Sequence, residues 1–223
     1  MPEIIFNGPE GRLEGRYHQN TGNPEAPTAL ILHPHPRYGG TMNNKVVYTL
    51  FHTFVRHGFS VLRFNFRGVG RSQGRFDNGQ GELADAAAAL DWMQAALPDS
   101  NTTWVAGYSF GAWIGMQLLM RRPEIRGFIS VSPPANIADF TFLAPCPASG
   151  LIIQGDADET VPEPDVAKLV QKLGLQRAIE VRYKVIKGAT HFFENDLDTI
   201  GKLVHDYLTE KMAPAAVAAT VAR

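Results

Sequence analysis

Continuous apolar runs alternate along this chain with segments whose apolar positions recur every three or four residues. Runs of the first kind are typical of strands buried on both faces of a sheet, and segments of the second kind are typical of helices that bury one face. We expect strands at residues 28–33, 59–66, 103–106, 127–131, 151–153 and 179–185, and helices at residues 42–56, 82–97, 112–119, 163–173 and 196–211. This alternation predicts an α/β fold, in which helices cover both faces of a mostly parallel sheet.

The beginning of the chain follows a different pattern. Residues 4–6 and 13–18 are strand-like and flank a glycine-bearing turn at residues 8–11, which predicts a hairpin and an antiparallel edge to the sheet. No internal repeat or low-complexity tract interrupts the chain, so we expect a single domain over residues 1–212. Residues 213–223 are rich in Ala and Val, and we expect them to form a flexible tail.

Composition and charge exclude several classes of function. The 223 residues are 44% hydrophobic and 19% charged, as in ordinary globular enzymes. The formal net charge is -1 and basic residues cluster no further than pairs such as Arg121-Arg122, so we expect no nucleic-acid partner.

The one cysteine, Cys146, can form neither an intrachain disulfide nor a cysteine metal cluster, which favours a reducing compartment. Residues 1–17 lack the apolar core of a signal peptide, and no apolar stretch reaches the roughly 20 residues that span a bilayer. We therefore expect a cytoplasmic protein with no membrane partner.

The segment Gly107-Tyr108-Ser109-Phe110-Gly111 lies between a predicted strand and a predicted helix. Its two glycines lack a Cβ, which lets a strand and a helix close on each other at a tight turn and leaves the serine exposed. The free N–H groups at the start of the helix would face the same point, where an oxyanion forms during acyl transfer. This pattern predicts that Ser109 is a nucleophile.

Two loops could suggest a metal or a cofactor. The loop at residues 33–40 reads His-Pro-His-Pro-Arg-Tyr-Gly-Gly, but alternate residues of an extended segment point to opposite sides and no carboxylate or cysteine lies nearby. We therefore interpret His33 and His35 as loop-bracing residues and expect no metal. The loop at residues 67–74 has its glycines at G-x-G-x-x-x-G, one residue away from the dinucleotide-binding spacing, so we expect no bound cofactor either.

Five features together resemble a known family: residues 33–42, residues 67–72, residues 107–111, residues 155–162 and His191. The chain resembles the small bacterial α/β-hydrolases, a serine esterase-like group close to the dienelactone hydrolase-like proteins. Within them it resembles the subgroup with an H-P-H-P-x-x-G-G-T-M loop. The likeness runs from about residue 28 to about residue 208 and implies the α/β-hydrolase fold. Dienelactone hydrolases proper carry cysteine where this chain has serine, so the likeness does not extend to dienelactone as the substrate.

The resemblance implies a catalytic triad in the chain order serine, acid, histidine. His191 and His205 follow Ser109 in the chain. His205 lies inside the last predicted helix, where a surface or packing role is expected. His191 follows a predicted strand, so a loop can carry its imidazole over the serine, and we favour it as the general base.

The acid is expected in the loop at residues 155–162, which offers two aspartates. Asp158 has the spacing G-x-x-D-x-x-V-P of the acid loop in many α/β-hydrolases, and Asp156 is the alternative that would cap the loop. We favour Asp158 as the group that accepts the second imidazole N–H of His191 and stabilises its charged form.

The oxyanion of an acyl-transfer intermediate needs two backbone N–H donors. The resemblance implies that one is the residue after the nucleophile, Phe110, and that the other lies in the histidine-proline loop. Pro34 has no N–H to donate. We therefore favour His35, with Arg37 or Tyr38 as alternatives.

Residues 132–148 are too few to form the multi-helix cap that lipases and many of their relatives insert before the acid strand. We expect an open site whose apolar walls come from aromatic residues, each of which could equally belong to the core. These residues are Tyr38, Phe140, Phe142, Phe192 and Phe193.

These observations predict a serine hydrolase that cleaves carboxylic esters through an acyl-enzyme, without a cofactor, and that acts on a small-molecule ester. An open site favours short-chain or soluble acyl esters. Two alternatives stay open: a thioesterase or small peptidase with the same triad, and a catalytically idle hydrolase fold that serves as a binding module. The sequence does not indicate the oligomeric state.

Overall fold

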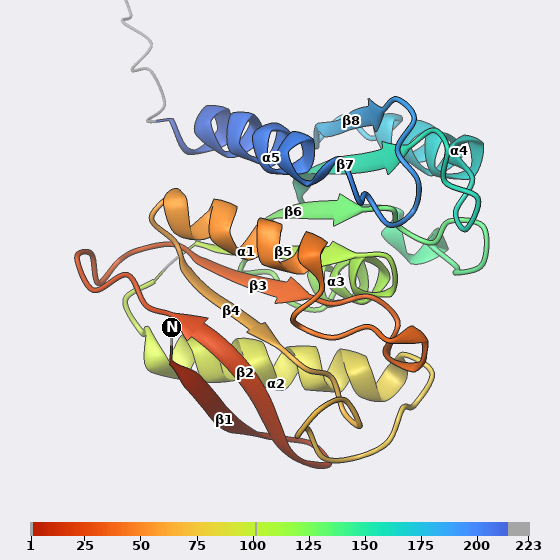
Figure 1. Ribbon diagram of the computed structural model, residues 1–223. Coiled ribbons are helices and arrows are strands. Elements are labelled where there is room, and N and C mark those ends of the chain that lie inside the picture. The colour runs from red at the N-terminus through yellow and green to blue at the C-terminus, as the bar shows by residue number, and fades with distance from the viewer. Residues whose placement is uncertain (1, 101, 214–223) are drawn as a thin grey trace, which may run out of the picture.

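A computed structural model describes residues 2–100 and 102–213, so nearly all of the tail expected at residues 213–223 lies outside it. The described strands form one sheet of eight in the order β1-β2-β4-β3-β5-β6-β7-β8 (Figure 1). They are β1 (Glu3–Gly8), β2 (Gly11–His18), β3 (Thr28–Leu32), β4 (Ser60–Phe64), β5 (Thr103–Tyr108), β6 (Ile125–Val131), β7 (Ser149–Gly155) and β8 (Val181–Ile186). Strands β1 and β2 pair antiparallel with each other, and β2 pairs antiparallel with β4. All other pairings are parallel, which confirms the predicted fold class and its antiparallel edge.

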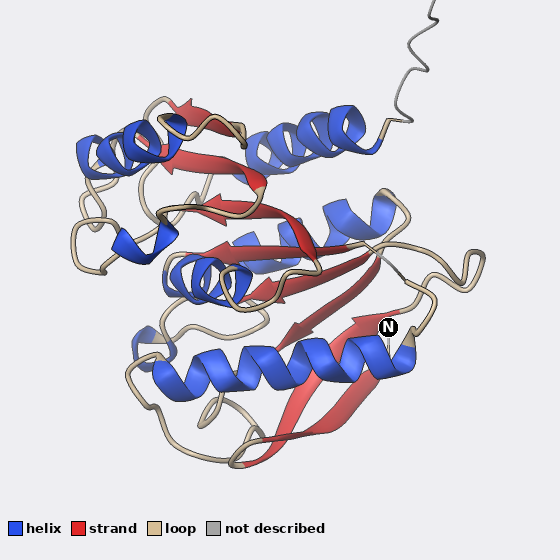
Figure 2. Cartoon of the chain, turned by 180° about the vertical axis from the view of Figure 1, so that it is seen from behind, coloured by secondary structure: helices blue, strands red, loops and turns tan. Residues whose placement is uncertain are grey.

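Helices cover both faces of the sheet (Figure 2). They are α1 (Lys45–Arg56), α2 (Gln80–Ala96), α3 (Phe110–Leu119), α4 (Glu163–Gly174) and α5 (Leu197–Met212). Helices α1 and α5 bury their apolar sides in one core cluster, and α2, α3 and α4 bury theirs in the other. No helix among the described residues has both the length and the apolar character needed to cross a membrane.

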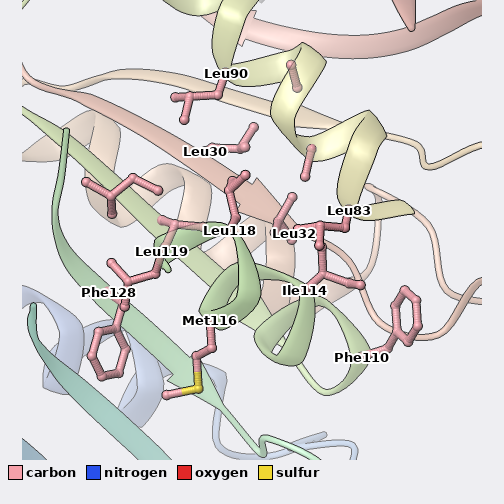
Figure 3. Packing of buried hydrophobic residues seen from close by; sticks show 14 of the residues in the cluster. Leu30, Leu32, Leu83, Leu90, Phe110, Ile114, Met116, Leu118, Leu119 and Phe128 are labelled. Atoms are coloured by element: carbon pink, nitrogen blue, oxygen red, sulfur yellow. The ribbon is translucent and has the colours of Figure 1, made fainter. Parts of the chain in front are cut away.

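The core between the sheet and helices α2 and α3 shows why the apolar runs become strands. Leu30 and Leu32 point from β3 toward Leu83 and Leu90 of α2 and toward Ile114 of α3 (Figure 3). All five are at least 97% buried. Burial of one such side chain stabilises the fold by about 1.5–3 kcal/mol, so the packing of this layer holds α3 firmly against the central strands.

Four of the five helices begin one to three residues away from their predicted starts, and for α1 and α2 a side chain at the start of the helix explains the difference. Helix α1 begins at Lys45 because the Asn44 side chain accepts the N–H groups of Val46 and Val47, at 2.9 and 3.4 Å. Helix α2 begins at Gln80, two residues before the predicted start. There the Glu82 carboxylate accepts the N–H of Gly79 at 2.7 Å, which caps the helix at this earlier start.

Candidate active site

Ser109 occupies a strained turn between β5 and α3. Its φ is 53° and its ψ is -117°, a conformation that costs a residue with a Cβ on the order of 1–3 kcal/mol. A Cβ on Gly107 would collide with the Gly111 carbonyl, and a Cβ on Gly111 would collide with the carbonyl of Leu32. The Ser109 N–H donates to the Val131 carbonyl at 2.8 Å, which ties the turn to β6. The local sequence therefore folds into the predicted strand, tight turn and helix, with the serine at the turn.

The structure brings Ser109, His191 and Asp158 together at the carboxyl edge of the sheet. Ser109 Oγ lies 3.2 Å from His191 Nε2, and His191 Nδ1 lies 2.7 Å from Asp158 Oδ2. An ionised carboxylate can only accept, so the imidazole proton lies on Nδ1 and Nε2 is free to accept from the serine hydroxyl. Asp158 and His191 are 5% and 8% exposed, so their contact is shielded from water.

The surroundings of Asp158 keep it ionised. Burial alone would raise the pKa of this carboxyl, but hydrogen bonds from His191, the Val161 amide and Gln154 outweigh burial and lower the pKa below its usual value. The Oδ1 atom accepts the amides of Thr160 and Val161 at 2.9 and 2.8 Å, and Oδ2 accepts Gln154 Nε2 at 3.1 Å. These bonds fix the carboxylate in the direction of the imidazole.

The two residues that the sequence offered as alternatives, Asp156 for the acid and His205 for the base, lie away from Ser109. Asp156 Oδ1 accepts the Gly188 N–H at 2.5 Å, so this exposed aspartate ties the end of β7 to the loop that leads to His191. His205 belongs to α5, and its Nδ1 lies 2.8 Å from Nε2 of His57 at the end of α1. Neither residue makes a described contact with Ser109.

Tyr108 contributes to the site although sequence reasoning did not single it out. Its hydroxyl donates to the His191 carbonyl at 2.5 Å, and its ring centroid lies 5.4 Å from the imidazole. Burial, with a smaller effect of the Asp158 charge, raises the pKa of Tyr108 above its usual range and keeps the hydroxyl a donor. Tyr108 thus holds the histidine loop next to the turn that carries Ser109. A tyrosine in a G-x-S-x-G segment carries no sequence signal for this contact.

The two residues whose amides are predicted to bind an oxyanion, Phe110 and His35, line the same cavity as Ser109. Phe110 is the first residue of α3, where an N–H has no acceptor within its own helix. In the histidine-proline loop, the Arg37 amide donates to His35 Nδ1 at 3.2 Å, and the Tyr38 amide donates to the His35 carbonyl at 3.1 Å. These bonds occupy the amides of the two alternatives, which favours His35 as the second donor.

A cavity of about 930 Å³ opens beside Ser109 and His191. Of the predicted apolar walls, Tyr38 and Phe192 line the cavity.

Phe193 does not line the cavity, because its φ of 49° turns the ring into the core, where it is fully buried. Phe140 and Phe142 stack on each other with centroids 6.0 Å apart and pack against the core, so for these two rings the core alternative is the one observed. Sequence reasoning missed several apolar lining residues, of which the large ones are Phe76, Phe110, Trp113 and Ile137.

The segment between β6 and β7 confirms the prediction that no large cap is present. Its only described helical element is the short 3-10 turn at Thr141–Leu143.

His33 and His35 play different parts in their loop. His33 is fully buried, and its Nδ1 donates to the Pro34 carbonyl at 2.7 Å while Nε2 accepts the Phe66 amide at 3.1 Å. Both ring nitrogens are thus engaged in tying the loop to the end of β4, as expected for a bracing residue. His35 faces the cavity.

We expect His33 to make stability depend on pH. Burial lowers the pKa of His33 to about 4, whereas a histidine in the unfolded chain titrates at about 6.5. Between these values the unfolded chain binds a proton that the folded chain does not, so the free energy of unfolding falls by about 3 kcal/mol as the pH drops from 7 to 4. Urea unfolding at pH 7 and 4 measures this loss. In the His33→Gln variant the loss should be smaller by about the same amount, and an equal loss in both proteins would contradict the assignment.

Comparison with known proteins places the fold and the site in context. A family model described as alpha/beta hydrolase fold matches residues 30–148. A solved protein of unknown function from Agrobacterium tumefaciens is 60% identical, with 95% of this chain and 96% of that chain covered and a TM-score of 0.93. An alpha-beta serine hydrolase homologue from Coxiella burnetii is 38% identical (93% and 97% covered, TM-score 0.83). A serine hydrolase without lid from Xanthomonas campestris is 32% identical (96% and 95% covered, TM-score 0.84). These serine hydrolase relatives support a hydrolase activity.

Proposed function

We propose that this chain, which belongs to the alpha/beta hydrolase family, is a serine hydrolase that cleaves carboxylic esters. The observation that carries the proposal is the continuous set of contacts from Ser109 Oγ through the His191 ring to Asp158, at 3.2 and 2.7 Å. Serine is a weak nucleophile until a neighbouring base removes its proton during attack. The arrangement supplies that base, a carboxylate that orients it, and a cavity in which an ester can meet the serine.

The first half of the reaction transfers the acyl group to the enzyme. Ser109 Oγ attacks the ester carbonyl carbon while His191 Nε2 accepts the hydroxyl proton, and the carbonyl electron pair moves onto the oxygen. The amides of Phe110 and His35 would donate to that oxyanion. As the tetrahedral intermediate collapses, the bond to the leaving oxygen breaks, and His191 returns the proton to the departing alcohol. The acyl group remains on Ser109.

The second half repeats these steps with water. His191 takes a proton from water as the water attacks the acyl carbon, and returns it to Ser109 Oγ when the acid leaves. Throughout, Asp158 stabilises the charged imidazole, Gln154 holds Asp158, and Tyr108 holds the histidine loop. The strained backbone of Ser109 holds Oγ at the turn within 3.2 Å of His191 Nε2, so little reorganisation precedes attack.

The absence of a large cap, together with the relative from Xanthomonas campestris that is described as having no lid, favours short-chain or soluble acyl esters as substrates. The same groups can also attack a thioester or an amide, and a panel of matched ester, thioester and amide substrates separates these possibilities. A binding module without catalysis would need none of the three side chains to be in contact.

Labelling with a fluorophosphonate probe tests the proposal. Ser109 should displace the fluoride and retain the phosphonyl group, because an activated serine attacks phosphorus as it attacks an acyl carbon. Peptide mass spectrometry should find the modification on the Ser109 peptide. A native protein that stays unlabelled, although the probe is active on a control hydrolase, would favour the idle binding module.

A further inference from the structure

One wall of the cavity beside Ser109 is a set of aromatic rings in mutual contact. The His35 ring lies 5.0 Å from Phe76 and 4.9 Å from Phe110, measured between centroids. Phe110 in turn lies 6.0 Å from Phe76 and 5.8 Å from Trp113. Phe110 stands at the start of α3, at the edge of the leucine-rich core (Figure 3). All four rings line the cavity, so an apolar group of the substrate meets an aromatic surface next to the serine.

Hydrogen bonds hold two of these rings in place before a ligand arrives. Trp113 Nε1 donates to the Asp139 carbonyl at 3.1 Å, and its ring occupies the space that a Cβ on Gly79 would fill. His35 Nδ1 accepts the Arg37 amide at 3.2 Å. Burial and the nearby Arg37 charge both lower the pKa of His35, so its ring is neutral at pH 7. The wall is therefore preformed and apolar, as is usual for a small-molecule site.

Exposed apolar side chains surround the mouth of the same cavity. Tyr38, Ile137 and Phe192 are 86%, 80% and 65% exposed, and all three line the cavity. Apolar surface that converges on a concave site and stays in contact with water is typical of a site that a ligand covers. The mouth and the inner wall thus favour a substrate with a rigid apolar group.

Arg37 is the one lysine or arginine among the described residues that line the cavity. Arg37 lines the cavity with its guanidinium 5.9 Å from the centre of the Phe76 ring, and it takes part in no described ion pair. Asp139 is the one carboxylate among the described lining residues. Its two oxygens already accept the amide and the hydroxyl of Thr141, each at 2.8 Å. Arg37 has no ion-pair partner among the described residues, so its guanidinium is available to an anionic group on a ligand that stacks on Phe76.

We propose that this cavity selects esters that carry a flat aromatic group with an anionic substituent, with the ring against Phe76, His35 and Phe110 and the anion facing Arg37. The inference rests on the proposed function for the reaction at Ser109, and it adds the class of substrate. Arg37 and Phe76 act as specificity residues that contact the substrate away from the reacting carbonyl. Arg37 selects for the negative charge of the substituent, and Phe76 selects for the flatness of the ring.

Three small probes separate the two properties: benzoate is flat and anionic, cyclohexanecarboxylate is anionic but not flat, and benzamide is flat but neutral. Their binding is measured by ligand-observed NMR on the Ser109→Ala variant, and their competitive inhibition of 4-nitrophenyl acetate hydrolysis is measured on the wild-type protein. We expect benzoate to bind about fivefold more tightly than benzamide, the size of effect that one partly exposed ion pair gives. We expect a similar preference of about fivefold over cyclohexanecarboxylate, because a planar ring stacks on Phe76 better than a puckered one. Arg37→Gln should abolish the preference over benzamide, and Phe76→Leu the preference over cyclohexanecarboxylate.

Two matched variants complete the test. Arg126→Gln removes an exposed positive charge at the amino end of β6, the end of the strand away from the cavity. Phe140→Leu alters a phenylalanine outside the cavity lining. Both should leave the preferences unchanged. Equal binding of the three probes, or the same shift in the matched variants, would overturn the proposal. Because the NMR measurement needs no turnover, a protein that binds benzoate selectively but hydrolyses no ester would contradict the proposed function and leave the binding site standing.

Discussion

Replacement of Ser109 by alanine is expected to lower kcat for 4-nitrophenyl acetate on the order of 10⁶-fold, the loss seen when the serine of such a triad is removed. The reason is that His191 then has no hydroxyl to activate, while the amides of Phe110 and His35 can still polarise a bound carbonyl. A residual rate, from water attacking a carbonyl that these two amides polarise, should remain measurable. Steady-state kinetics gives the effect, and circular dichroism shows whether the fold is intact.

Ser132 offers a matched control for this substitution. It follows β6 directly, is fully buried, and has a positive φ of 43°, as Ser109 has a positive φ at the end of β5. Its Oγ has no hydrogen-bond partner among the described residues. The Ser132→Ala variant should therefore keep its activity within a few-fold of the wild type. Turnover that survives in Ser109→Ala at the wild-type rate would rule out the acyl-enzyme route proposed for this site.

Much of the fold could be predicted because buried positions appear in the sequence either as continuous apolar runs or as apolar residues at regular spacing. The continuous apolar run at residues 28–33 became β3, with all five strand residues buried, and the periodic segment that includes Leu50 and Phe54 became α1. The glycines at 107 and 111 could be assigned to a tight turn because a Cβ at either position would meet backbone atoms. The three residues that the structure brings together followed from chain order and loop spacing, which fix the strand end from which each side chain starts.

The shape of the cavity could not be predicted, because it depends on loops whose directions are set by distant contacts. Phe192 and Phe193 are neighbours of the same type, yet one is 65% exposed and the other fully buried. The positive φ of Phe193 makes this difference, and no local pattern encodes it. Phe76 reaches the site from a long loop before α2, far in sequence from Ser109. Tyr108 escaped notice for the same reason, since it acts through a contact with the His191 carbonyl beyond the end of β8. Gln154 acts locally, on Asp158 in the loop after its own strand, but its position in an apolar run gave no sign of this contact.

Asp158→Asn is the second substitution from which we expect a large effect, a fall in kcat of about 10⁴-fold with little change in KM. An asparagine in this place can donate its NH₂ group to His191 Nδ1. The imidazole then carries its proton on Nε2, and Nε2 can no longer accept the proton of Ser109. The charge that stabilises the imidazolium is lost as well. The Thr160 and Val161 amides still find an oxygen acceptor, so the loop should keep its conformation.

Asp156→Asn separates this role from the general effect of removing a carboxylate from the loop. Asp156 lies two residues earlier, is exposed, and bonds to the Gly188 amide, a contact that an asparagine oxygen can keep. We therefore expect kcat to change less than tenfold, since one exposed hydrogen bond contributes about 1 kcal/mol. The two variants, compared over pH 5 to 9, decide which aspartate orients the base. Asp158 is the acid if its variant alone loses activity at every pH, and Asp156 takes that role if the losses are reversed.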